Sequence, residues 1–172
     1  MAISSAIRPY LEDLERAIDE SVEAALYADW QRFADGRHTA TDIFSPRRRR
    51  PLAPMTLAWP KVLMNPAFED FDLMAVRELA GCRRLLAEDG GSPLSVRCNY
   101  GTGIMPSLFG AAVYMMDASI DEKPTTRHLA GGLDRIRRLV DGGVPDVAGG
   151  LGERVWAMAE RFLEIEIGRA HV

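Results

Sequence analysis

The succession of elements between residues 94 and 116 limits the fold more than any other part of the sequence. A β-favouring run, 94–98, leads into Asn99-Tyr100-Gly101-Thr102-Gly103, here called the glycine loop, and a turn of helix is expected at Pro106. A second β-like run covers 112–116. Short apolar runs that alternate with helices are typical of βα units. The pattern therefore predicts an α/β fold with a parallel sheet or barrel.

Helical periodicity surrounds this region. Apolar residues recur at steps of three and four over 9–33, which predicts a long amphipathic helix. Further helices are expected after Asn65-Pro66, over 132–141 and from Leu151 onward. The proline-rich stretch 37–65 predicts a long irregular loop, and loops of that length are usually either functional or disordered.

Length and charge exclude several classes of protein. A chain of 172 residues suits one domain or one piece of a larger domain. The net charge of −4 argues against a dedicated nucleic-acid binder. No apolar run approaches the ~18 residues that span a bilayer, and the N-terminus lacks a signal-peptide layout, so we expect a cytoplasmic protein without a membrane partner. Cys82 and Cys98 are too few for a four-ligand zinc site and are expected to be small buried side chains.

The last seven residues, Glu166 to Val172, do not continue the pattern of the helix before them. "EIGRAHV" has no apolar stripe, and it can be encoded by GAG-ATC-GGA-AGA-GCA-CAC-GTC, the start of a widely used short-read sequencing adapter. The alternative is a natural polar tail. We therefore expect 166–172 to be translated adapter, and the natural sequence to continue differently after Ile165.

Four stretches resemble the uroporphyrinogen decarboxylase superfamily, and more narrowly an uncharacterised bacterial branch of it. They are "DGRHTATDIFSPRRRR" (35–50), "VRCNYGTGIMPSLFG" (96–110), "KPTTRHLAGGLDRIRRLVDGGVPD" (123–146) and "GLGERVWAMAERFLE" (150–164). The resemblance implies that 1–165 is the N-terminal portion of a (β/α)8 TIM-type barrel. Such a portion is expected to be inactive by itself and to expose sheet edges and apolar helix faces that invite aggregation.

The resemblance also implies a kind of chemistry. Relatives are decarboxylases that need no cofactor (lyases), or zinc-dependent methyltransferases that work with a corrinoid protein. Zinc and a corrinoid partner are thus compatible with the full-length protein, together with a homodimer, whereas no metal ligand is assigned within this chain. The expected ligand is small and anionic or of tetrapyrrole type.

Candidate ligand contacts follow from the position of the glycine loop. Barrel enzymes carry their sites on the loops that follow the strands, and Asn99, Tyr100 and Thr102 offer hydrogen-bonding groups there. The alternative is a turn that only requires positive φ, with Asn99 bonding its own backbone. Arg97 is either a structural ion-pair residue or a ligand contact, and Arg127 is a weaker candidate for carboxylate binding. No catalytic residue is assigned.

Two departures from the family pattern matter. The decarboxylases carry an aspartate near the position of Tyr100-Gly101, and a pair of arginines after the first strand that is missing from "TLAWPKVLMNPAFED" (56–70). A non-catalytic ligand-binding barrel is therefore the alternative function. The arginine run Arg47–Arg50 could bind an anion or nucleic acid, but an acidic chain favours a solvated loop.

Overall fold

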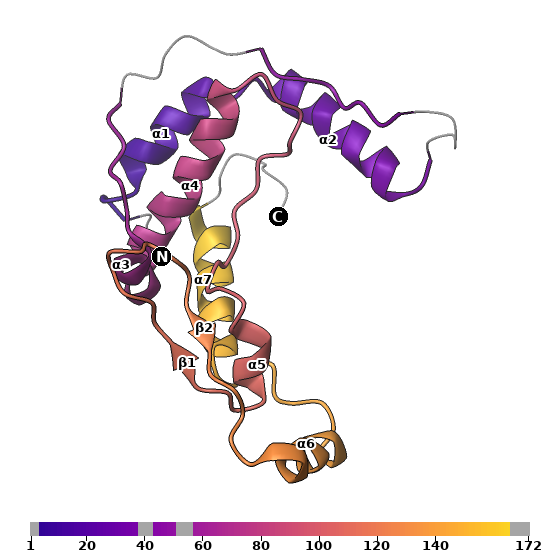
Figure 1. Ribbon diagram of the computed structural model, residues 1–172. Coiled ribbons are helices and arrows are strands. Elements are labelled where there is room, and N and C mark those ends of the chain that lie inside the picture. The colour runs from indigo at the N-terminus through magenta and orange to yellow at the C-terminus, as the bar shows by residue number, and fades with distance from the viewer. Residues whose placement is uncertain (1–3, 38–42, 51–56, 166–172) are drawn as a thin grey trace. The chain divides into compact units, whose positions relative to one another are not determined.

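The computed structural model describes residues 4–37, 43–50 and 57–165 (Figure 1). Seven helices and two short strands occur among them, in the order α1 (Arg8–Ala17), α2 (Glu20–Ala34), α3 (Met64–Glu69), α4 (Phe71–Ala87), α5 (Ile104–Leu108), β1 (Val113–Tyr114), β2 (Thr125–Thr126), α6 (Gly132–Asp141) and α7 (Gly152–Ile165). The described part of the chain is thus rich in helix, with one small sheet. None of its helices is long and apolar enough to cross a membrane.

Two compact units divide the chain. Unit 1 contains Lys61–Arg77 and Arg97–Ile165, and unit 2 contains the described parts of Ile3–Pro60 together with Glu78–Val96. Buried apolar side chains fill each unit. Those of unit 1 include Met64, Phe68, Met74, Tyr100, Leu151, Met158 and Phe162, and those of unit 2 include Ile7, Leu11, Leu14, Leu26, Leu79 and Leu86.

The prediction of one long helix over 9–33 is wrong, because two helices, α1 and α2, occupy this region. Ile18 has an extended backbone with ψ 124°, and Asp19 caps α2 by accepting hydrogen bonds from the amides of Ser21 at 3.0 Å and Val22 at 3.3 Å. An aspartate that binds free amide groups at a helix start competes with continuation of the previous helix. The apolar spacing is nearly the same on both sides of such a break, so periodicity did not reveal it.

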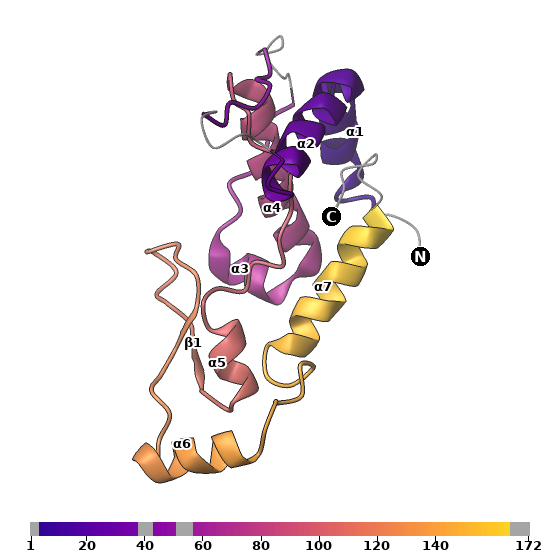
Figure 2. The same ribbon diagram turned by 90° about the vertical axis from the view of Figure 1, so that its right-hand side faces the viewer.

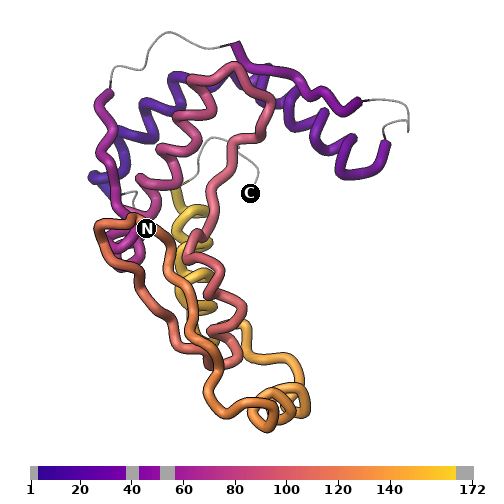
Figure 3. Tube along the Cα trace, viewed as in Figure 1, coloured from indigo at the N-terminus to yellow at the C-terminus, as the bar shows by residue number. Residues whose placement is uncertain are grey.

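The region from 94 to 126 differs most from expectation. Residues 94–98 form no strand, and Figure 3 traces the chain between α4 and α5 as an extended run. Side chains take up its carbonyl groups: Arg49 Nη1 donates to Ser92 O at 2.7 Å, and Cys82 Sγ donates to Ser95 O at 3.5 Å. The predicted run 112–116 shortens to β1, which pairs antiparallel with β2, Val113 opposite Thr126. This pair is the sheet of the described residues, in place of the parallel sheet expected.

The later helices confirm the periodicity. Helix α6 covers the predicted span 132–141, and α7 begins one residue after Leu151. The prediction of an irregular stretch over 37–65 is confirmed where the structure describes it, since 43–50 and 57–63 contain no helix or strand. The stretch ends slightly earlier than predicted, because α3 begins at Met64. The suspected adapter, 166–172, lies outside the described residues.

The acidic turn after β1, which contains Asp117, Asp121 and Glu122, has a structural role in unit 1. Asp121 Oδ1 accepts a hydrogen bond from the amide of Met64 at 2.7 Å, at the start of α3, and pairs with Arg77 Nη1 at 3.1 Å. The Met64 hydrogen bond and the Arg77 charge hold the pKa of Asp121 below its ordinary value. Asp121 takes positive φ, which aspartate tolerates better than most side chains. It therefore connects its turn to α3 and α4.

The arginine run Arg47–Arg50 serves unit 2 as an internal clamp. Arg49 is 3% exposed, and its guanidinium donates to both carboxylate oxygens of Glu23, at 2.5 and 2.6 Å. Its amide donates to Gly90 O at 2.9 Å. Arg48 makes an exposed pair with Asp89 at 3.2 Å. These two arginines bind partners within the chain, which agrees better with a structural role than with an extended anion-binding surface.

Replacement of Arg49 is expected to test this clamp. Arg49→Ala leaves Glu23 without its buried partner, and the loss of one member of a buried ion pair costs about 3–5 kcal/mol. Arg48→Ala is the matched control, because an exposed pair contributes only about 0–1 kcal/mol. Urea unfolding of both variants at low protein concentration measures the difference. Equal midpoints for the two variants would show that Arg49 is not a clamp.

Candidate functional site

The glycine loop lies against the segment that links β1 to β2. Gly101 has φ +83°, and a Cβ on it would collide with the carbonyl oxygen of Pro124. A Cβ on Gly103 would come 3.0 Å from Thr126 Cγ2. The space that glycine leaves at position 101 is thus filled by the chain itself rather than left for a ligand. Gly101 fits the turn interpretation of the loop, and it brings the stretches 96–110 and 123–146 into contact.

Tyr100 is the buried side chain of this loop. It has no exposed surface, and its ring meets that of Phe68 edge-to-face at 5.5 Å. The side chain of Arg154 lies beside the Tyr100 hydroxyl, which makes no close hydrogen bond with the described residues. Burial raises the pKa of Tyr100 to about 12, although the positive charge of Arg154 and its weak hydrogen bond to the phenol act in the opposite direction. The phenol therefore stays protonated at neutral pH and is a hydrogen-bond donor, not a base.

Arg154, in the first turn of α7, is the second polar group of the site. Its guanidinium carbon lies over three rings, at 5.2 Å from Phe68, 5.1 Å from Phe71 and 5.6 Å from Tyr100. Its Nη2 donates to the carbonyl of Glu69 at 2.7 Å, while its Nε is buried without a partner among the described residues. Arg154 was not among the site residues predicted from the sequence. One sequence feature could have indicated it: Arg154 is a basic residue in the first turn of a predicted helix, where the helix dipole disfavours positive charge.

Ser107 fixes the start of α7 beside α5. Its buried hydroxyl donates to Ile104 O at 2.7 Å and accepts from the amide of Leu151 at 2.9 Å. Gly150 has φ +53°, and a Cβ there would lie 2.6 Å from Ser107 O. Helices α5 and α7 lie side by side in both views of the chain (Figures 1 and 2). This junction places Arg154 beside Tyr100 of the glycine loop, so the stretch 150–164 lies against the stretch 96–110.

The other predicted site residues are placed differently. Asn99 is half-buried, whereas Thr102 and Arg97 are exposed. Arg127 is exposed, with its guanidinium 5.1 Å from the ring centre of Tyr114 and its amide bonded to Ala112 O at 3.0 Å. Of the five predicted residues, Tyr100 is thus the one found in the Arg154 cluster.

No group of three His, Cys, Asp or Glu side chains that could hold a metal ion occurs among the described residues. Cys82 is buried, and burial raises the pKa of its thiol. Its side chain therefore behaves as a small apolar group that donates weakly to Ser95 O.

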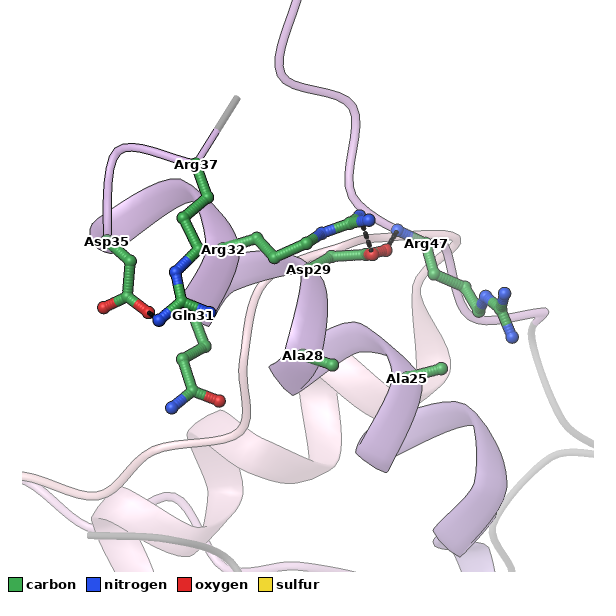
Figure 4. A pocket seen from close by; sticks show the side chains of 8 residues that line it. All are labelled: Ala25, Ala28, Asp29, Gln31, Arg32, Asp35, Arg37 and Arg47. Carbon is green, nitrogen blue, oxygen red and sulfur yellow. Dashed lines mark hydrogen bonds and ion pairs between the residues drawn. The ribbon is translucent and has the colours of Figure 1, made fainter. Parts of the chain in front are cut away.

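Unit 2 has a separate surface hollow of about 390 Å³ beside α2 (Figure 4). Its lining consists of Ala25, Ala28, Asp29, Gln31, Arg32, Asp35, Arg37 and Arg47. Two of its arginines turn to aspartates of the same lining, Arg32 to Asp29 at 2.6 Å and Arg37 to Asp35 at 3.4 Å. Because these pairs neutralise much of the charge, we assign the candidate site to the Tyr100–Arg154 cluster.

The turn at Gly101 can be tested by adding one methyl group. Gly101→Ala is expected to destabilise the chain by about 1–3 kcal/mol, since alanine disfavours positive φ and its Cβ meets Pro124 O. Gly81→Ala is the control, because Gly81 lies within α4 with nothing in the path of a Cβ, and a stabilisation of about 0.5–1 kcal/mol is expected there. Circular dichroism melts measure both. A Gly101→Ala chain as stable as the unchanged protein would contradict the assigned turn.

The sequence matched no protein-family model, and neither the curated proteins nor the solved structures gave a significant match.

Proposed function

We propose that the chain is the N-terminal portion of a uroporphyrinogen decarboxylase-like (β/α)8 barrel enzyme of the decarboxylase or corrinoid-linked methyltransferase type, inactive by itself. The observation that carries the proposal is an excess of exposed apolar side chains in unit 1. On α6, Leu133 is 70% and Val140 73% exposed, and Ile136 between them is exposed as well. An apolar stripe at steps of three and four is the face that a helix normally packs against a sheet. Further chain that covers this stripe would give α6 the place of a barrel helix.

Helix α7 gives the same indication. Its residues Met158 and Phe162 are buried, while Trp156 and Leu163, on another face, are 56% and 63% exposed. A helix that is apolar around most of its circumference is usually covered on more than one side. Large exposed apolar patches mark surfaces that bind other protein. Additional barrel units after residue 165 are the simplest cover for both helices.

The ligand in this proposal is small and anionic, or a tetrapyrrole, and the glycine loop forms part of its site. Tyr100 supplies a protonated hydroxyl and Arg154 a positive charge. Asn99, Thr102, Arg97 and Arg127 remain candidates for outer contacts of a large ligand. Zinc and a corrinoid protein belong to the methyltransferase version alone. The metal ligands would have to come from further chain, because the described residues do not form such a group.

A non-catalytic ligand-binding barrel is the second candidate, and one observation favours it. In the decarboxylases that the sequence resembles, an aspartate of the matching loop accepts hydrogen bonds from pyrrole N–H groups. Tyr100, at this position, has a pKa of about 12 and so offers a proton donor in neutral solution. A loop without a carboxylate can hold an anionic ligand and still lack the acceptor that porphyrinogen decarboxylation uses.

Fluorescence quenching tests whether further chain covers α7. In the 172-residue chain Trp156 is expected to be open to acrylamide, since it is 56% exposed. In the product of the gene read onward from codon 165 it is expected to be shielded. Trp156→Phe, made in both proteins, isolates its signal from those of Trp30 and Trp59. Equal quenching of Trp156 in the two proteins counts against the barrel.

Turnover tests the enzymatic part separately. The extended protein is expected either to transfer methyl groups from methylcobalamin to a thiol or to decarboxylate a porphyrinogen, and the 172-residue chain to do neither. Tyr100→Phe is expected to reduce the activity about tenfold or more, as loss of a hydrogen bond to a charged ligand does. Tyr114→Phe is the matched control. Saturable porphyrin binding without turnover would select the second candidate, and absence of both binding and turnover in a folded protein would reject the two together.

A further inference from the structure

We propose that helix α6 of one copy of the chain docks on helix α7 of a second copy, and that two copies pair by exchanging this contact. Each helix exposes an apolar stripe whose residues are three and four positions apart. The stripe of α6 consists of Leu133, Ile136 and Val140, all exposed, and no residue of α6 is buried. The stripe of α7 consists of the exposed Trp156 and Leu163 with the half-buried Ala159 between them. Stripes of this kind are faces that helices pack against one another.

The two stripes fit each other when the helices run antiparallel. Reversal of α7 changes its steps of three and four into steps of four and three, so that Leu133 meets Leu163 at one end. Val140 meets Trp156 at the other end. In the middle the branched side chain of Ile136 meets the alanine of the α7 stripe. A large side chain opposite a small one lets two helices interdigitate closely.

The charges beside the stripes favour the same alignment. Arg137 follows the central residue of the α6 stripe, and Glu160 follows that of the α7 stripe, so both lie on the same edge. Antiparallel helices bring like edges together, which places Arg137 opposite Glu160. Arg137 pairs with Asp134 at 3.2 Å within its own helix, but both are largely exposed, and such a pair contributes little. Glu160 is exposed and has no cationic partner among the described residues. The basic edge of α6 is thus complementary to the acidic edge of α7.

The partner is a second copy because α6 does not lie along the α7 of its own chain. In both views α6 lies past the N-terminal end of α7 (Figures 1 and 2). The link between the helices is held in place from Val147 onward, since Val147 O leaves no space for a Cβ on Gly152 and the amide of Leu151 donates to Ser107 at 2.9 Å. Two copies related by a twofold axis can each give α6 to the other, which covers both stripes of each copy. This pairing does not require the barrel, and further chain over the same stripes would displace it.

Exchange of the two charges tests the pairing, with sedimentation equilibrium of the 172-residue chain from micromolar to millimolar concentration. The unchanged chain is expected to form dimers, and Trp156 to become less open to acrylamide as they form. Arg137→Glu and Glu160→Arg are each expected to weaken the dimer about tenfold or more, because like charges then meet. A mixture of the two variants is expected to pair again, since each contact of the mixed dimer regains opposite charges.

Arg138→Glu is the matched control, because the exposed Arg138 lies on the side of α6 away from the stripe, and it is expected to leave the dimer unchanged. A chain that circular dichroism shows to be folded but that stays monomeric at millimolar concentration would overturn the pairing. So would a mixture that remains as monomeric as its two components, or association that Arg137→Glu and Arg138→Glu affect equally, which indicates non-specific contact of apolar surface. These results leave the turnover of the extended protein as a separate question, so the two proposals can fail independently.

Discussion

The hydroxyl of Ser107 is the contact on which the arrangement of unit 1 depends. It binds Ile104 O and the amide of Leu151 at once, and so connects the turn of α5 to the start of α7 through one buried oxygen. Gly150 allows the two chain segments to approach closely. Because the first turn of α7 is fixed at this junction, Arg154 is held over the rings of Phe68, Phe71 and Tyr100. The candidate site thus depends on a serine that does not itself belong to it.

Periodicity located the helices in the sequence but not every break between them. Helix α6 agrees with its predicted bounds because an amphipathic stripe flanked by glycines has few alternative structures. The expected helix over 9–33 divides at Asp19 because a local hydrogen bond from the aspartate side chain to two amides competes with helix continuation. In the sequence, the break is indicated only by a single aspartate within an otherwise regular apolar stripe, and this signal is weaker than the helical signal of the stripe.

Strands and site partners were harder to predict because they depend on distant residues. The run 94–98 has β-favouring composition, yet Arg49 and Cys82 bind nearby carbonyls that a neighbouring strand would otherwise take up. β-propensity describes fit to a half-buried pleated surface, and the sequence does not reveal whether that surface exists. In the same way Tyr100 was predicted as a site residue from its loop, whereas Arg154, 54 positions further along, was recognised only from its contacts with that loop.

If the chain is the barrel portion proposed above, Tyr100 gives the glycine loop a polarity opposite to that of the decarboxylase loop. An aspartate at this position presents acceptor oxygens and a negative charge, whereas a protonated phenol beside a guanidinium presents donors and a positive charge. A pyrrole N–H, which an aspartate would attract, meets in this pair one neutral phenol oxygen and a cation instead of a carboxylate, while carboxylate oxygens meet two donors. A barrel of the same architecture with this loop would therefore contact a different part of its ligand. Under the proposed relationship, the glycine loop and the missing decarboxylase acid are compatible, because the loop would concern the fold and the acid would concern which end of a ligand the loop contacts.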